Sequence, residues 1–308
     1  MVRFNFVVRP LTACCCIALQ AVAFGHDGPE HEIQELTERI AKEGESADLL
    51  LKRAVEYGVM GKNTEATKDL ERALSFEANS PEIQGALSRA YFVSGKTNEA
   101  LQTVTSALKK SAEASEYASL LMVRVDILRA RHEYQKALDD ADNAILKHPH
   151  VAEWYLTRSQ LQARLKLHAS RVEGLRDGIK QTGSGVLEAE WIDALIDDEQ
   201  HSKALEKIEA ELKASRLQSS WLIRRAKVRL ATGREEEGKS DLEAAIAELN
   251  LRIGTASPDP SLLADRGRAY DILGKKEDAR KDYQQAKEKG VADDWLSDRI
   301  AALKEQEK

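Results

Sequence analysis

A period of 34 residues runs through most of the chain and limits it to a repeat architecture. Residues of the same kind meet at a shift of 34 in the pairs Tyr57 and Tyr91, Gly61 and Gly95, Ala66 and Ala100, and Ala73 and Ala107. A similar spacing returns near the C-terminus at Gly267, Tyr270, Gly274, Ala279, Tyr283 and Ala286. A unit of this size cannot bury its apolar face alone, so such units stack on their neighbours.

The composition favours helices and excludes several classes of protein. Gly and Pro number only 17 and 6 in 308 residues, and aromatic residues make up 5%, whereas the hydrophobic set reaches 42% and can form a core. Lys and Arg total 46 against 52 Asp and Glu, which gives a net charge of -6. This balance excludes a strongly basic nucleic-acid binder, a disordered chain and a protein with many membrane spans.

The repeated residues resemble those of the tetratricopeptide repeat family. The resemblance implies an all-α, right-handed α-solenoid of about seven helix-turn-helix repeats, each stacked on the next. The implied repeats span residues 47–80, 81–114, 118–151, 152–184, 185–218, 219–253 and 260–291. We expect capping helices in the flanks 26–46, through Ile33, Leu36 and Ile40, and 292–308, through Trp295, Leu296, Ile300 and Leu303.

Small residues recur at positions twenty and twenty-seven of the implied repeats, where the two helices of a unit approach closely. Three central residues depart from the pattern, namely Gln162 at position eleven, Arg171 at position twenty and Glu211 at position twenty-seven. Two wider spacings place extra residues around 111–116 and 254–260, where we expect turns.

The first 25 residues have the pattern of a secretory signal peptide. Arg3 and Arg9 precede an uncharged apolar stretch from Leu11 to Gly25, and cleavage motifs of small residues end at Ala23 and Gly25. We expect an exported protein, periplasmic or secreted. An alternative is an N-terminal membrane anchor or a lipoprotein, because Leu11-Thr12-Ala13-Cys14 resembles a lipobox. All three cysteines lie at 14–16, so no disulfide framework follows.

The family resemblance implies that the first helix of each repeat lines a binding groove, which positions two, five, nine, twelve and thirteen face. Position five is mostly apolar, and position nine carries mixed charges. The residues predicted to form the partner-binding groove are Leu51, Val55, Arg89, Met122, Asp126, Leu156, Gln160, Asp193, Ile223, Lys227 and Arg268. The alternative is that some position-five residues pack between neighbouring helices as core. No position five is Lys and no position nine is Asn, so the carboxylate clamp of chaperone-tail adaptors is not expected.

A basic stretch from Arg216 to Arg234 contains six cations and no acid. It could bind an acidic partner, but we favour ion pairs with acids of the preceding repeat, such as Asp193 opposite Lys227. Nucleic acid is not an expected partner, because the chain is acidic and lacks aromatic stacking platforms.

No catalytic motif and no cofactor site is evident, so an enzyme is not expected: the sequence lacks a phosphate loop, a GxSxG elbow and a HExxH pair. His26 and His31 near the expected mature terminus form a weaker candidate site for Cu(II).

The sequence therefore predicts a non-catalytic scaffold or adaptor of the cell envelope that holds a peptide or helix of a partner protein in its groove. Two alternatives stay open. One is a self-assembling structural solenoid, and the other is metal binding by the N-terminal histidines.

Overall fold

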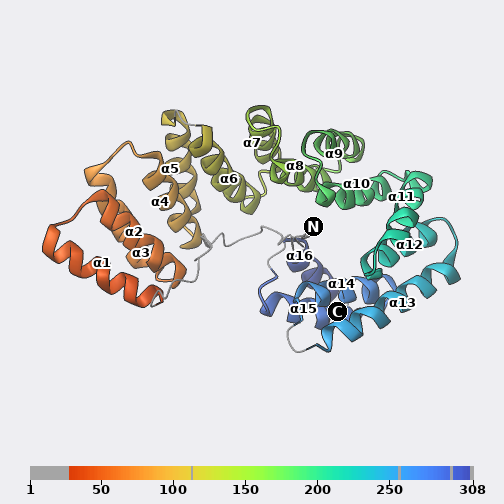
Figure 1. Ribbon diagram of the computed structural model, residues 1–308. Helices are drawn as coiled ribbons and strands as arrows, with labels where there is room; N and C mark the ends of the chain where they lie inside the picture. The colour runs from red at the N-terminus through yellow and green to blue at the C-terminus, as the bar shows by residue number, and fades with distance from the viewer. Residues whose placement is uncertain (1–27, 112–113, 256–257, 292–293, 306–308) are drawn as a thin grey trace, which may run out of the picture. The chain divides into compact units, whose positions relative to one another are not determined.

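The computed structural model describes residues 28–111, 114–255, 258–291 and 294–305, and the secondary structure of these residues is α-helical without a strand. The helices follow one another along the chain in the order shown in Figure 1. Their bounds are α1 Pro29–Glu43, α2 Ala47–Val59, α3 Asn63–Phe76, α4 Pro81–Val93, α5 Thr97–Lys110, α6 Ala114–Ala130, α7 Tyr134–Lys147, α8 Ala152–Arg164, α9 His168–Thr182, α10 Gly185–Asp197, α11 His201–Ala214, α12 Ser219–Ala231, α13 Glu235–Ile253, α14 Ser261–Ile272, α15 Lys276–Glu288 and α16 Asp294–Glu305.

The chain divides into two compact units. The N-terminal unit contains α1 to α8, and the C-terminal unit contains most of α9 and all of α10 to α16. The prediction of seven helix-turn-helix repeats with capping helices is confirmed: α2 to α15 form seven pairs of first and second helices, and α1 and α16 flank them.

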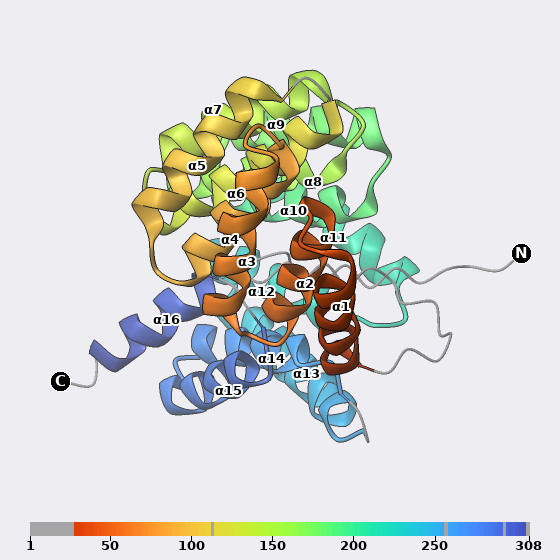
Figure 2. The ribbon, with the colours of Figure 1, turned by 90° about the vertical axis from the view of Figure 1, so that its left-hand side faces the viewer.

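Within the N-terminal unit each helix packs on the next one along the chain, from α1 to α8. First helices also contact each other, α2 with α4 and α4 with α6 (Figure 2). The core between α2 and α3 is lined by Ala54, Ala66 and Ala73, all almost fully buried. Their small side chains let the two helices approach closely, and Ile40 of α1 closes this core at its end.

The C-terminal unit repeats this scheme, with α10 on α11, α12 on α13 and α14 on α15. Gly267 of α14 shows how close the approach is. A Cβ atom at this position would lie 2.6 Å from Cε1 of Tyr283 on α15, so a larger residue would force the helices apart. Leu296 and Leu303 of α16 are fully buried against the same core and cap the unit.

The two wider spacings are accommodated partly by longer helices. The expected turn at 111–116 is shorter than predicted, because α6 already begins at Ala114. At the second site α13 runs for 19 residues, to Ile253, and carries part of the extra length as helix. Residues of good helix propensity, Ala114 and Glu116 in α6 and Leu249, Leu251 and Arg252 in α13, are compatible with both extensions.

Candidate partner-binding faces

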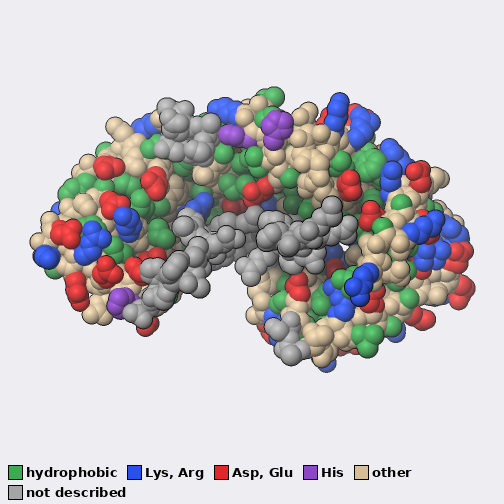
Figure 3. Space-filling model, viewed as in Figure 1, with side chains coloured by type: hydrophobic (Ala, Val, Ile, Leu, Met, Phe, Trp, Pro, Cys, Tyr) green, Lys and Arg blue, Asp and Glu red, His purple; other side chains and the backbone are tan. Residues whose placement is uncertain are grey.

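The predicted residues of the N-terminal unit lie on its first helices. Leu51 and Val55 are half-buried on α2, one turn apart, and Leu51 packs partly against the core. Beyond them the surface becomes more exposed, with Val59 at 44% and Val93 of α4 at 56%. Hydrophobic side chains reach the surface over α2 and α4 (Figure 3). We call Leu51, Val55, Val59 and Val93 the apolar face.

The remaining predicted residues of this unit are half-buried as well. Arg89 lies on α4, Met122 and Asp126 on α6, and Leu156 and Gln160 on α8. Met122 packs partly against the core of α5 to α8. Each of these side chains thus combines contact with the fold and access to solvent, which is what a binding surface requires.

Several charged side chains lie together on the first helices of the C-terminal unit. Arg224 of α12 donates from Nε and Nη2 to the two carboxylate oxygens of Asp193 on α10, at 3.0 and 2.7 Å. Lys227, one turn further along α12, is exposed. Arg268 of α14 donates to Asp265 at 3.4 Å. We call Asp193, Arg224, Lys227, Asp265 and Arg268 the charged face.

The pKa values of the two carboxylates of the charged face are shifted in opposite directions. Burial alone raises the pKa of Asp193, but Arg224 and Lys227 outweigh it, so this pKa lies below its ordinary value. Burial also raises the pKa of Asp265, and there Arg268 and Arg224 only reduce the rise. Asp193 is therefore held firmly ionised by its arginine, whereas the charge of Asp265 is less completely compensated.

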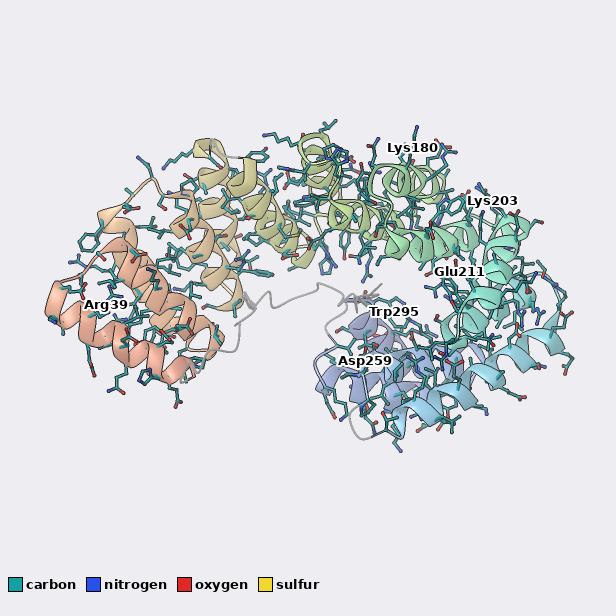
Figure 4. The ribbon with its side chains drawn as sticks, viewed as in Figure 1. Arg39, Lys180, Lys203, Glu211, Asp259 and Trp295 are labelled. Carbon is teal, nitrogen blue, oxygen red and sulfur yellow. The ribbon has the colours of Figure 1, made fainter. Side chains whose placement is uncertain are left out.

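Trp295 borders the charged face, and its place there was not expected. The guanidinium carbon of Arg268 lies 4.4 Å from the centre of the Trp295 ring, within the range of a cation–π contact. Figure 4 labels Trp295 at the start of α16. Sequence reasoning assigned this residue to the apolar side of the capping helix. The periodicity of α16 alone gives no sign that an arginine of α14 stacks on it.

Ile223 differs from its predicted place in the groove. Its side chain on α12 is only 5% exposed, and Ala264 at the same position of α14 is 7% exposed. In the C-terminal unit these position-five side chains fill the contact between packed first helices, so Ile223 offers almost no surface to a partner.

Three of the six cations in the basic stretch, Arg224, Arg225 and Arg229, form ion pairs, as favoured from the sequence, although with other partners than expected. Asp193 pairs with Arg224 and not with Lys227, which lies at the position equivalent to Asp193. Arg225 bonds both Asp241 of its own repeat and Glu209 of the preceding one. Arg229 also contacts Asp241, at 2.8 Å.

The buried Arg171 explains one irregular repeat. It occupies a position that holds a small residue in the six other repeats, and it is 5% exposed on α9. Its Nη2 donates to Glu190 of α10 at 2.7 Å, and its Nη1 donates to Asp197 of the same helix. Two carboxylates thus compensate a guanidinium in the place of a methyl group.

The part of the chain that the structure describes contains no further ligands for the metal site predicted at His26 and His31. His26 lies outside these residues, and His31 is exposed on α1. Among the described residues no three His, Cys, Asp or Glu side chains gather in a way that could hold a metal ion. No described helix is long and apolar enough to cross a membrane.

An open groove of about 460 Å³ lies along the second helix α5, on another side of the repeats. Its lining is mainly polar, with Asn98, Gln102, Thr105 and Lys109 beside Leu101. This groove lacks the exposed apolar side chains of the apolar face, so it is the weaker candidate for peptide binding.

The alternation of helices and the exposed first-helix faces define a helical repeat protein of the solenoid class. A family model for the tetratricopeptide repeat matches residues 60–121. No curated protein sequence matches the chain significantly.

Solved structures extend this match over most of the chain. A tetratricopeptide repeat protein from Parabacteroides merdae is 16% identical, with a TM-score of 0.58, and the match covers 89% of this chain and 99% of that one. The C-terminal part of a repeat protein from Cytophaga hutchinsonii is 15% identical, with a TM-score of 0.53 and coverage of 82% and 98%. The Pseudomonas aeruginosa pilF protein is 14% identical, with a TM-score of 0.51 and coverage of 74% and 97%.

Residues 60–121 thus match the tetratricopeptide repeat, and the chain over most of its length has the fold of tetratricopeptide repeat proteins. The identities are low, so the likeness to these structures describes the fold alone.

Proposed function

We propose that the chain is a non-catalytic scaffold that binds a peptide or helix of a partner protein on the first helices of its N-terminal unit. The tetratricopeptide repeat fold suggests protein–protein interaction in general. The observation that carries the finer proposal is the apolar face, where Val59 and Val93 are about half exposed beside Leu51 and Val55. Apolar side chains that share one exposed surface are typical of an interaction site.

The end helices argue against end-to-end assembly as the main function. The exposed residues of α1 include Glu35, Glu38 and Lys42, and those of α16 include Asp298 and Lys304. Terminal units of a solenoid keep such polar outer surfaces when they end the stack in solvent.

The function is tested by a change that disturbs the apolar face and leaves the core intact. Cells that express wild type or Val59→Asp/Val93→Asp are cross-linked, and the captured proteins are identified by mass spectrometry. We expect a partner that wild type captures and the variant loses, because a charged side chain on the face opposes its desolvation. Circular dichroism checks that the variant remains helical.

The matched control is Leu146→Asp/Leu251→Asp, which introduces the same charges at leucines 80% and 79% exposed on the second helices α7 and α13. The control should still capture the partner. Capture that both variants retain, or that both lose while folded, would contradict the proposal for this face.

The envelope location is part of the proposal. It is supported by Arg3, Arg9 and the apolar stretch 11–25, which lie outside the described residues. Residues 1–30 fused to a reporter that is active only after export should give activity. An inactive fusion would indicate a protein that stays in the cytoplasm.

A further inference from the structure

The charged face has one cation that its surroundings leave unpaired. Lys227 is exposed, and no carboxylate of the described residues lies within ion-pair distance of its ammonium group. The nearby Asp193 is occupied, because Arg224 binds both of its oxygens. Lys227 therefore presents a charge that a ligand can use.

Arg268 is also incompletely used. Its side chain is 37% exposed, and among the described residues it makes one hydrogen bond, at 3.4 Å, to Asp265. A guanidinium group has five N–H donors, and the cation–π contact of Arg268 with Trp295 does not require them. Several donors of Arg268 are thus available to a carboxylate.

The two cations lie on one surface. Lys227 and Arg268 occupy the same position of successive first helices, α12 and α14, which contact each other. Both lower the pKa of the same carboxylate, Asp193. Neighbouring cations on packed helices can bind one anionic group together, as an isolated surface lysine cannot.

We propose that Lys227 and Arg268 bind an acidic segment of an extended partner peptide, with apolar atoms of the peptide against the indole ring of Trp295. This inference rests on the proposed function, since it takes the first-helix faces to be peptide-binding surfaces. It adds the chemical class of the segment that the C-terminal unit recognises.

A basic segment fits the same surface less well. Both oxygens of Asp193 are already bonded to Arg224, and the exposed ammonium of Lys227 lies on the same face. A lysine of the partner would have to compete with Arg224 for Asp193 and would be repelled by Lys227, whereas an acid would be attracted by Lys227 and Arg268.

Peptide display tests the assignment. A random peptide library is selected on the purified full chain, as wild type and as Lys227→Glu/Arg268→Gln. We expect peptides selected on wild type to be enriched in Asp and Glu, and the enrichment to disappear with the variant. A selected acidic peptide should bind the variant about tenfold more weakly in a fluorescence anisotropy titration, because two attractive charge contacts are lost and a repulsive one is added.

Two further variants sharpen the result. Lys213→Glu/Arg216→Gln makes the same charge change at exposed residues outside the first helices and should retain the enrichment. Lys227→Arg keeps the charge and should bind the acidic peptide within about threefold of wild type.

The proposal is wrong if wild type selects no peptides, selects peptides without excess acid, or selects the same acidic peptides as Lys227→Glu/Arg268→Gln. Failure here is distinguishable from failure of the proposed function. Partner capture that depends on Val59 and Val93, together with unchanged peptide selection on the charged-face variant, would overturn only this inference.

Discussion

At the scale of single residues, the turn inside each repeat imposes one backbone conformation. The residue fifteen places into every repeat has a positive φ, between 56° and 77°. Glycine occupies this place in four repeats, but His132, Lys166 and Glu199 occupy it in the three central ones. The left-handed conformation brings a Cβ atom too close to the backbone, so these three residues hold a strained turn.

Replacing the strained residues by glycine should stabilise the protein. We expect Lys166→Gly and Glu199→Gly each to raise the free energy of unfolding by about 0.5–1 kcal/mol. This value is the backbone strain relieved in the folded state minus the conformational entropy that glycine adds to the unfolded chain. Urea titration followed by circular dichroism measures this.

The reverse change at Gly233 is the control. An added Cβ there meets no atom within 4 Å, so Gly233→Ala introduces backbone strain alone and should lower the free energy of unfolding by about 1 kcal/mol. If Gly233→Ala changed the free energy of unfolding by the same amount and in the same direction as Lys166→Gly and Glu199→Gly, the turn would have no preference for glycine.

At the scale of helices, an arginine–aspartate pair links the two helices of four repeats. In each pair the arginine of the first helix donates to both oxygens of an aspartate 16 residues later on the second helix. The pairs are Arg53 with Asp69, Arg124 with Asp140, Arg225 with Asp241 and Arg266 with Asp282. The repeat 81–114 has Leu87 and Thr103 in these places, so an uncharged contact is compatible with the fold.

A double-mutant cycle on Arg266 and Asp282 separates the pair from its surroundings. Asp282 is 3% exposed, so Asp282→Leu leaves the Arg266 guanidinium without its carboxylate and should cost about 3–5 kcal/mol. Arg266→Leu/Asp282→Leu should cost less than this single change, because no charge remains uncompensated. Thermal or urea unfolding gives the four free energies, and additive costs would show that the pair does not act as a unit.

At the scale of the whole molecule, stability is expected to be distributed along the repeats. Each helix contacts near neighbours in the chain, so a local change should weaken the adjacent repeat and leave distant ones intact. The capping helix α16 offers a matched pair of positions to test how far a local change spreads. Leu303 is fully buried, and Ala301, two residues earlier, is exposed.

Leu303→Asp should raise amide hydrogen exchange in α14 and α15 and leave exchange in α2 to α5 unchanged, because the buried charge opens the core shared with Tyr283. Ala301→Asp carries the same charge on the exposed side and should leave all of these helices protected. Faster exchange throughout the chain with Leu303→Asp would indicate a single cooperative unit.

Part of the site was accessible from the sequence, and part was not. The repeat register predicted which residues lie on the first helices. It did not predict that Ile223 is buried, or that Arg224 and not Lys227 binds Asp193. Both outcomes depend on how neighbouring first helices pack. The arginine–aspartate pairs carry a sequence signal that repeat reasoning missed, since Arg and Asp recur 16 residues apart in four repeats.

The sequence by itself determined the helical repeat fold, because small residues at a fixed period permit close packing only in helix pairs that stack on their neighbours. It also indicated the turn inside four of the repeats, through Gly61, Gly95, Gly233 and Gly274. Tertiary structure alone decided which charges meet. Arg171 with Glu190 and Arg268 with Trp295 come from different helices, so their contact depends on side-chain lengths and helix placement that no local pattern encodes.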